Sequence, residues 1–346
     1  MRIEEQSDAA AAAAPQPQSS GAVTMRAVVQ RRYGPPDVLE SVVVKRPAPA
    51  RGEVLVRVAA ASVHPGDCFV MTGEPYLVRL VYGLRRPRHG IPGRDFAGVV
   101  TEVGDDVTAL RPGDEVFGWS TTGSLAEYVC APADNVAPTP AGLSAVAAAA
   151  VPTSAMTALQ ALRDIAHVRP GQTVLITGAS GGVGSFAVQI AKAIGAEVTG
   201  VCRTRNIDLV RSLGADHVVD GTATDFTRGG KRYDVILDSV EAQPLEDVRR
   251  ALAPTGVLIP NSGRGGRWLG PLGRIAKTRV LSAFTRQRLR PFTSVGKHHD
   301  LLTLAELIAT GQVTPAIDRT YALDDAADAL RYVGAGHARG KVVVTI

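Results

Sequence analysis

Cysteine is scarce in this chain of 346 residues, which contains only Cys68, Cys130 and Cys202. Three widely spaced thiols provide neither a disulfide framework nor a C-x2-C pair. They therefore exclude a disulfide-rich secreted scaffold and a cysteine-ligated structural zinc site. Unpaired cysteines are typical of a reducing compartment, and we expect a cytoplasmic protein.

Long apolar runs and a strong excess of one charge are also missing. No stretch of 18 apolar residues occurs, so the sequence predicts no membrane-spanning helix. The net charge is only +5, and no aromatic residues alternate with the basic clusters as they do in nucleic-acid modules. We expect no nucleic-acid partner. The length leaves room for two globular domains.

The first 24 residues lack aromatic side chains and consist largely of alanine, proline, glutamine and serine. Such a segment cannot bury enough apolar surface to order itself, so we expect residues 1–24 to be a disordered tail. Acidic residues near its start replace the positive charge of a secretory signal. The folded part is expected to begin at Met25, which is itself a candidate initiator.

Residues 173–184 have the sequence TVLITGASGGVG, a β-branched run followed by four glycines, and an amphipathic segment follows at 185–194. Glycines let a phosphate approach the backbone, and a helix N-terminus offers free N–H groups to it. The spacing differs from the common G-x-G-x-x-G, so the loop alone also fits an unrelated α/β protein. The alternation of apolar strands and helices after it favours an α/β, doubly wound parallel sheet that binds a dinucleotide.

An acidic residue is missing at the end of the second strand, 197–202, where an NAD site places one for the ribose hydroxyl. The chain instead has Arg203, Thr204, Arg205 and Asn206. Guanidinium groups suit the 2′-phosphate of NADPH because they offer a planar fork to phosphate oxygens. The sequence therefore predicts NADPH; the alternative is that the arginines are simply solvated.

The rest of the chain has a different pattern of predicted secondary structure. Residues 25–150 contain short strands separated by proline, glycine and aspartate turns, and residues 299–346 end in another strand at 341–346. We expect a β-rich domain over 25–150 that is completed by 299–346. The dinucleotide-binding domain would occupy 151–298.

Several motifs now identify a family resemblance. They are AASVHPGD at 60–67, IPGRDFAG at 91–98, RPGDEVFG at 111–118, LAEYV at 125–129, TALQAL at 157–162 and ARGKVVV at 338–344, together with the glycine loop. In these motifs the chain resembles the medium-chain dehydrogenase/reductase superfamily, in its zinc-independent quinone-oxidoreductase-like branch, over residues 25–346. The resemblance implies a GroES-like catalytic domain, a Rossmann domain, hydride transfer in the cleft between them, and a homodimer.

Catalytic zinc is not expected. Alignment with zinc-dependent relatives puts His64 at the first ligand position, Arg94 at the second and residues 151–153 at the third, so a cation and a thiolate-free segment replace two ligands. Without a metal Lewis acid, hydride transfer requires an acceptor that is already polarised, such as a quinone or an α,β-unsaturated carbonyl.

The resemblance also implies site residues. His64, where relatives commonly have asparagine, and Tyr76 are candidate proton or hydrogen-bond donors; the alternatives are a histidine that only lines the cleft and an ordinary loop tyrosine. The positions that match cofactor contacts are Thr153, Thr157, Ser180, Gly181, Gly182, Val183, Arg203, Thr204, Arg205, Asn206, Ser239, Val240, Asn261 and Ser262. Glu241 replaces a glycine of the relatives.

The segment 264–296 combines seven arginines with glycine, proline and aromatic residues. In relatives this region contributes to the substrate cleft and the dimer edge; the alternative is a basic amphipathic surface that meets membranes or acidic partners.

Together these features predict an NADPH-dependent, zinc-independent reductase of quinones or enones and enals. One alternative is an enoyl reductase that acts on carrier-bound or polyketide-like substrates. Another is a crystallin-like NADPH-binding protein that binds nucleic acid and turns over little.

Overall fold

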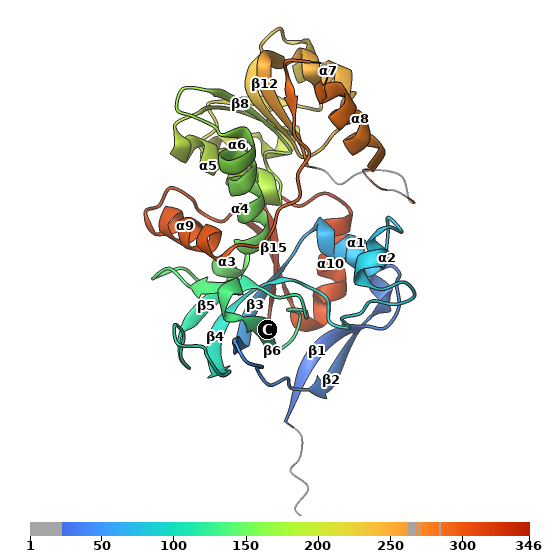
Figure 1. Ribbon diagram of the computed structural model, residues 1–346, viewed down its shortest axis with the longest axis vertical. Coiled ribbons are helices and arrows are strands. Elements are labelled where there is room, and N and C mark those ends of the chain that lie inside the picture. Colours follow the sequence, from blue (N-terminus) through green and yellow to red (C-terminus); the bar gives the residue numbers. More distant parts are fainter. Residues whose placement is uncertain (1–22, 262–267, 269, 271, 284) are drawn as a thin grey trace, which may run out of the picture.

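The structure is a computed structural model that describes residues 23–261, 268, 270, 272–283 and 285–346. Figure 1 shows two bodies stacked along the long axis, one around a parallel sheet and the other around a mainly antiparallel sheet. This arrangement confirms the α/β class. Within the described residues, no helix has both the length and the apolar character needed to cross a membrane.

The parallel sheet has the strand order β10-β9-β8-β11-β12-β13. Its elements are β8 Thr173–Thr177, α5 Gly182–Ile194, β9 Glu197–Cys202, α6 Ile207–Ser212, β10 His217–Asp220, β11 Tyr233–Asp238, α7 Leu245–Arg250, β12 Leu252–Pro260, α8 Leu272–Ala283 and β13 Arg288–Leu289. The chain runs outward from β8 to β9 and β10, then returns to the other side of β8 at β11. Doubly wound sheets bind their ligands at such a switch point, and we call the place at the carboxyl ends of β8 and β11 the crevice.

The second sheet has the order β14-β15-β3-β4-β5-β7, with β6 also paired to β3, while β1 and β2 form a separate antiparallel ribbon. Its elements and the helices around it are β1 Thr24–Gln30, β2 Leu39–Lys45, β3 Glu53–Val63, α1 Pro65–Thr72, α2 Val78–Tyr82, β4 Asp95–Val103, β5 Glu115–Trp119, β6 Tyr128–Pro132, β7 Val136–Pro138, α3 Ala145–Ala149, α4 Pro152–Leu159, α9 His298–Ala309, β14 Ile317–Ala322, α10 Ala326–Gly334 and β15 Lys341–Thr345. The late strand β15 pairs with β3, so the end of the chain joins the sheet that its beginning forms.

Some sequence-based boundaries need correction. Thr24, which we expected in the tail, begins β1, because its backbone pairs with Lys45 of β2. β4 begins at Asp95, within the IPGRDFAG motif, and the Asp95 side chain is fully buried. Residues 1–22 lie outside the described residues, and the domain boundaries at 150 and 298 remain a prediction.

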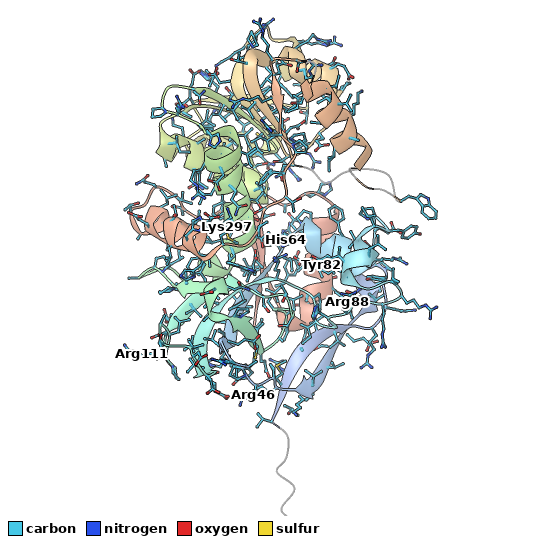
Figure 2. All side chains as sticks on the ribbon, viewed as in Figure 1. Arg46, His64, Tyr82, Arg88, Arg111 and Lys297 are labelled. Carbon is cyan, nitrogen blue, oxygen red and sulfur yellow. The ribbon has the colours of Figure 1, made fainter. Side chains whose placement is uncertain are left out.

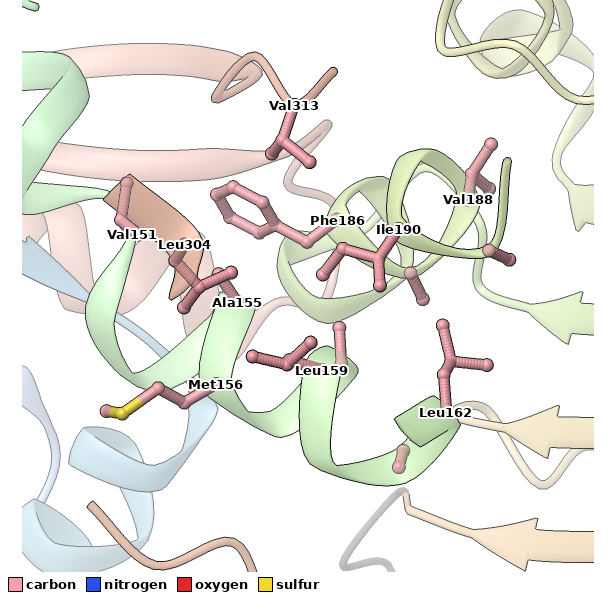
Figure 3. Close-up of a cluster of buried hydrophobic side chains, with 14 of the residues drawn as sticks. Val151, Ala155, Met156, Leu159, Leu162, Phe186, Val188, Ile190, Leu304 and Val313 are labelled. Carbon is pink, nitrogen blue, oxygen red and sulfur yellow. The ribbon is translucent and has the colours of Figure 1, made fainter. Parts of the chain in front are cut away.

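The helices α4 and α5 pack against each other in the largest apolar cluster. Figure 3 shows Phe186 and Ile190 of α5 facing Ala155 and Leu159 of α4. α4 is buried on nearly all sides because it lies between the two sheets. Most of its side chains are small, so other elements can pack closely against every face of the helix. Its N-terminus is thereby fixed beside the crevice.

Candidate functional site

The glycine loop joins β8 to α5 in a conformation that needs glycine. Gly178 has a left-handed φ of +65°, and a Cβ on Gly184 would lie 2.1 Å from the carbonyl oxygen of Gly178. Gly181 is the N-cap of α5, which has 13 residues, and the cap offers no side-chain acceptor to the first-turn N–H groups. These N–H groups, aligned with the helix dipole, suit a pyrophosphate.

Two predicted cofactor residues meet beside this loop. The Asn206 side chain donates a hydrogen bond from Nδ2 to Ser180 Oγ at 2.8 Å, and both residues are buried. Asn206 Oδ1 has no hydrogen-bond partner among the described residues, and neither has Ser239 Oγ at the end of β11. Buried polar atoms are usually paired, so these two border a space that a polar ligand fits. The crevice therefore suits a dinucleotide.

The segment after β9 is less uniformly basic than its sequence indicated. Arg203 and Arg205 are exposed, and Arg205 Nη2 donates to the His337 carbonyl at 3.2 Å. The Thr204 hydroxyl, however, donates to Asp220 Oδ2 at 2.7 Å. Asp220 ends β10 next to Cys202, and hydrogen bonds from Thr222 and Thr204 lower its pKa, so it stays ionised. A carboxylate thus stands near the predicted 2′-phosphate pocket, supplied by the neighbouring strand.

The loop after β11 carries Glu241, which stands where the relatives have glycine. Glu241 has a left-handed φ of 53°, the conformation that glycine adopts freely and other residues rarely adopt. Val240 N donates to Thr177 Oγ1 at 3.2 Å, which holds the loop over β8. After β12, Asn261 N donates to the Asp238 carbonyl at 2.9 Å. Ser262, also predicted to bind the cofactor, lies outside the described residues.

The two predicted threonines on α4 already use their hydroxyl protons within the protein. Thr153 donates from both N and Oγ1 to the carboxylate of Asp95. Thr157 Oγ1 donates to the Thr153 carbonyl at 2.7 Å. Each hydroxyl oxygen can still accept a hydrogen bond, so their contact with the cofactor remains a prediction, as acceptors rather than donors.

His64 is held at the start of α1 by Asp67. The two residues form a capping box in which His64 N donates to Asp67 Oδ2 at 2.8 Å, and His64 Nδ1 lies 3.5 Å from the same oxygen. The other ring nitrogen, Nε2, is buried without a hydrogen-bond partner among the described residues. Burial raises the pKa of Asp67, and the charge of His64 opposes that shift. The pair therefore presents one oriented, unused imidazole nitrogen.

Tyr76 is fixed by ring contacts rather than by a contact with His64. Its ring meets Trp268 edge to face with 5.0 Å between centroids, and the Arg79 guanidinium lies 4.6 Å from its centre. Trp268 belongs to the body of the parallel sheet, so the loop after α1 touches both bodies. A role of Tyr76 as a donor remains a prediction.

Sequence analysis missed a buried ionic cluster under the glycine loop. Lys341 of β15 is 1% exposed, and its Nζ donates to Ser154 Oγ at 3.0 Å and lies 3.8 Å from Asp95 Oδ2. Burial lowers the pKa of Lys341, while Asp95 and Asp67 oppose that shift. A Cβ on Gly182 would lie 3.4 Å from the Lys341 side chain, so the cluster lies next to the loop. The sequence does contain a sign of this cluster, because Asp95 and Lys341 each stand within an otherwise apolar strand sequence.

The first two predicted zinc-ligand positions are His64, paired with Asp67, and the cation Arg94. In the described part of the chain, no group of three histidine, cysteine or acidic side chains is arranged to hold a metal ion. Zinc binds through nitrogen, thiolate and carboxylate ligands, so these residues do not fit it.

Comparison with known proteins agrees with this architecture. Residues 50–141 match the alcohol dehydrogenase GroES-like domain family, and residues 213–344 match a family described as zinc-binding dehydrogenase. The chain is 35% identical over 339 residues to the chloroplastic quinone-oxidoreductase QR1 of Triphysaria versicolor, covering 92% of this chain and 98% of that protein. It is also 35% identical over 328 residues to the mitochondrial NAD(P)H oxidoreductase RTN4IP1 of Mus musculus, covering 85% and 82% respectively.

Solved structures show the same likeness. The quinone oxidoreductase from Coxiella burnetii superposes with a TM-score of 0.83 at 29% identity, over 94% of this chain and all of that one. The CurK enoyl reductase superposes with a TM-score of 0.80 at 25% identity, over 93% of this chain and 99% of that one.

The fold and the crevice thus define a two-domain dehydrogenase or reductase that uses a nicotinamide cofactor. The chain belongs to the medium-chain dehydrogenase/reductase superfamily, among the quinone-oxidoreductase-like oxidoreductases.

Proposed function

We propose that this chain reduces quinones or α,β-unsaturated carbonyl compounds with NADPH, without a metal ion. The observation that carries the proposal is His64 Nε2, which is buried and has no hydrogen-bond partner among the described residues. Asp67, which holds the other side of the His64 ring, also interacts electrostatically with the buried Lys341 next to the glycine loop. When bound, the reduced nicotinamide supplies the hydride. The chain's own residues orient the acceptor, exclude water, and offer a donor to the acceptor oxygen, where negative charge develops.

The coenzyme assignment rests on Arg203 and Arg205. Both guanidiniums are exposed beside the Ser180–Asn206 contact, where a 2′-phosphate adds charge that they can bind. Replacing both by serine should lower kcat/KM for NADPH by roughly 10- to 100-fold, because hydrogen bonds to charged groups are worth about 1.5–3 kcal/mol. Values with NADH should barely change. An equal loss with both coenzymes, or a preference of the unmodified protein for NADH, would refute the assignment.

His64 is the donor we propose. His64→Gln keeps a polar side chain but removes the imidazole that would give a proton to the acceptor oxygen, and kcat should fall by about 10²–10⁴-fold. Asp67→Asn keeps the helix cap and should shift the pH profile of kcat. Tyr76→Phe keeps the contacts with Trp268 and removes only the hydroxyl. A large loss in Tyr76→Phe, with none in His64→Gln, would transfer the donor role to Tyr76.

The proposed metal independence is testable by chelation. Because Arg94 stands at a ligand position, turnover should survive dialysis against a strong chelator. Loss of activity that zinc restores would contradict this part of the proposal.

Reduction of carrier-bound enoyl substrates is a second candidate, favoured by the likeness to the CurK enoyl reductase. Rates with 2-enoyl thioesters far above those with quinones would establish it. NADPH binding without turnover on any acceptor, together with salt-sensitive binding of nucleic acid, would instead indicate the crystallin-like alternative.

We also propose a homodimer in the cytoplasm. In the described part of the parallel sheet, β13 pairs only with β12, which leaves an edge available to a second copy. The three cysteines are all unpaired, as expected in a reducing compartment. Light scattering should give twice the mass of one chain, and the mass of a single chain would contradict the proposed homodimer.

A further inference from the structure

An apolar stripe points outward from α2. Leu77, Leu80 and Val81 follow the spacing of one helix face, i, i+3 and i+4, which normally packs into a core, and Leu84 comes directly after Gly83, the residue that ends the helix. Here Leu80, Val81 and Leu84 are 61%, 66% and 67% exposed. The positions between them, such as Val78 and Tyr82, are the partly buried ones. The helix therefore turns its apolar face away from the protein.

Trp268 extends this stripe from the other body. It is 73% exposed, although its ring touches Tyr76 at the start of the α2 region. The contact brings together segments almost 200 residues apart in the sequence. Because Tyr76 directly precedes Leu77, Trp268 and the stripe expose apolar side chains on neighbouring elements, which makes a patch rather than scattered apolar residues. We call these five residues, Leu77, Leu80, Val81, Leu84 and Trp268, the α2 patch.

The surroundings of the α2 patch are basic. Residues 75–94 contain no aspartate or glutamate, and neither do residues 248–299, the segment that carries Trp268. Arg85, Arg86, Arg88 and His89 follow the stripe and are exposed, and none of the arginines forms an ion pair among the described residues. Figure 2 shows Tyr82 and Arg88 on the side of the molecule where Figure 1 places α2. The patch therefore combines exposed apolar side chains with arginines that have no ion pair among the described residues.

We propose that the α2 patch and these arginines bind the surface of an anionic lipid bilayer. Leucine, valine and tryptophan side chains enter the boundary between headgroups and acyl chains, while arginines beside them contact the phosphates. A second copy of the chain fits the face poorly, because a two-fold dimer here would bring the same arginines against each other. Surface binding of this kind needs no membrane-spanning helix and does not depend on the coenzyme or the acceptor.

Sedimentation with lipid vesicles tests the proposal. The full chain is mixed with vesicles of phosphatidylcholine alone, and with vesicles in which a third of the lipid is phosphatidylglycerol. We expect at least roughly tenfold more binding to the anionic vesicles, and a strong decrease in high salt. No binding to the anionic vesicles, or equal binding to both kinds, would overturn the proposal.

Matched variants locate the surface. Leu80→Ser/Val81→Ser should reduce vesicle binding about tenfold, because it removes half of the stripe. Val43→Ser/Leu302→Ser removes exposed apolar side chains elsewhere and should bind like the unmodified protein. Both double variants should retain the melting temperature, since the positions are exposed. Equal binding by all three proteins would refute the placement.

The charges are tested separately. Arg85→Ser/Arg86→Ser should reduce binding to anionic vesicles and weaken its salt dependence. Arg111→Ser/Arg228→Ser removes the same charge from other exposed positions and is the control. An equal effect of the two variants would show that only net charge matters, against a specific face.

Trp268 gives a direct readout. The chain has two tryptophans, and Trp119 is 4% exposed, so lipids brominated on their acyl chains should quench Trp268 selectively. Trp268→Phe should abolish the quenching. Quenching that persists in this variant would contradict the proposal. Two other results would also contradict the proposal. One is a dimer that dissociates in the variant Leu80→Ser/Val81→Ser, and the other is an acidic protein that binds the patch while vesicles do not bind.

Discussion

Replacing Lys341 by methionine removes a buried cation and leaves its carboxylate partner in place. The Lys341 side chain is 1% exposed and that of Asp95 is 0% exposed, with Nζ 3.8 Å from Oδ2. Breaking a buried pair on one side costs about 3–5 kcal/mol, because the remaining charge stays desolvated. Asp95 keeps the hydrogen bonds from Thr153, so we expect the lower part of this range, about 3–4 kcal/mol. The melting temperature should fall by roughly 6–16 °C.

Thermal unfolding followed by circular dichroism measures this loss. Asp95→Asn combined with Lys341→Met removes both charges and should recover more than half of the stability, because no unpaired carboxylate remains. Lys297→Met is the control, since Lys297 is 45% exposed and lies 4.0 Å from Asp164. Its melting temperature should stay within about 2 °C of the unmodified protein. A similarly small change in Lys341→Met would refute the reasoning.

Two further predictions concern titration. Burial, and next the neighbouring Asp67, raise the pKa of Cys68 to about 12, so its thiol should resist iodoacetamide at neutral pH until the protein is denatured; rapid labelling detected by mass spectrometry would contradict this. Hydrogen bonds from the backbone and the guanidinium of Arg26 lower the pKa of Glu127 below its unfolded value. The stability from this carboxylate is present above the unfolded pKa and is lost as the pH falls through the folded one. Glu127→Gln should therefore show a smaller fall in melting temperature between about pH 6 and pH 3; an unchanged fall would exclude the contribution.

Local sequence patterns were sufficient for the elements of the dinucleotide crevice. The run 173–184 and the amphipathic segment after it predict a strand, a glycine turn and a helix in that order. The structure has β8 at Thr173–Thr177, a left-handed Gly178, and α5 from Gly182, three residues before the predicted segment at 185–194. The strand and turn pattern predicted a β-rich domain over 25–150, but the sequence of a strand does not indicate which strand it pairs with.

Contacts between distant segments could not be predicted. Ser154 and Lys341 are 187 positions apart, and only the pairing of β15 with β3 brings that lysine under the glycine loop. Asp220 likewise reaches the segment after β9 through strand register, which no local spacing specifies. The outward direction of the α2 stripe was not predictable either, because periodicity identifies an apolar face without saying what covers it.

The central claim is that NADPH reduces a conjugated acceptor in this crevice, and the decrease of NADPH absorbance tests it most directly. The full chain is incubated with quinones, enals, enones and simple aldehydes, each with NADPH and with NADH. We expect oxidation of NADPH that depends on a quinone or an enone, with a kcat/KM at least about tenfold above that with NADH and little turnover of simple aldehydes. A preference for NADH, or no acceptor-dependent oxidation by any of these compounds, would contradict it.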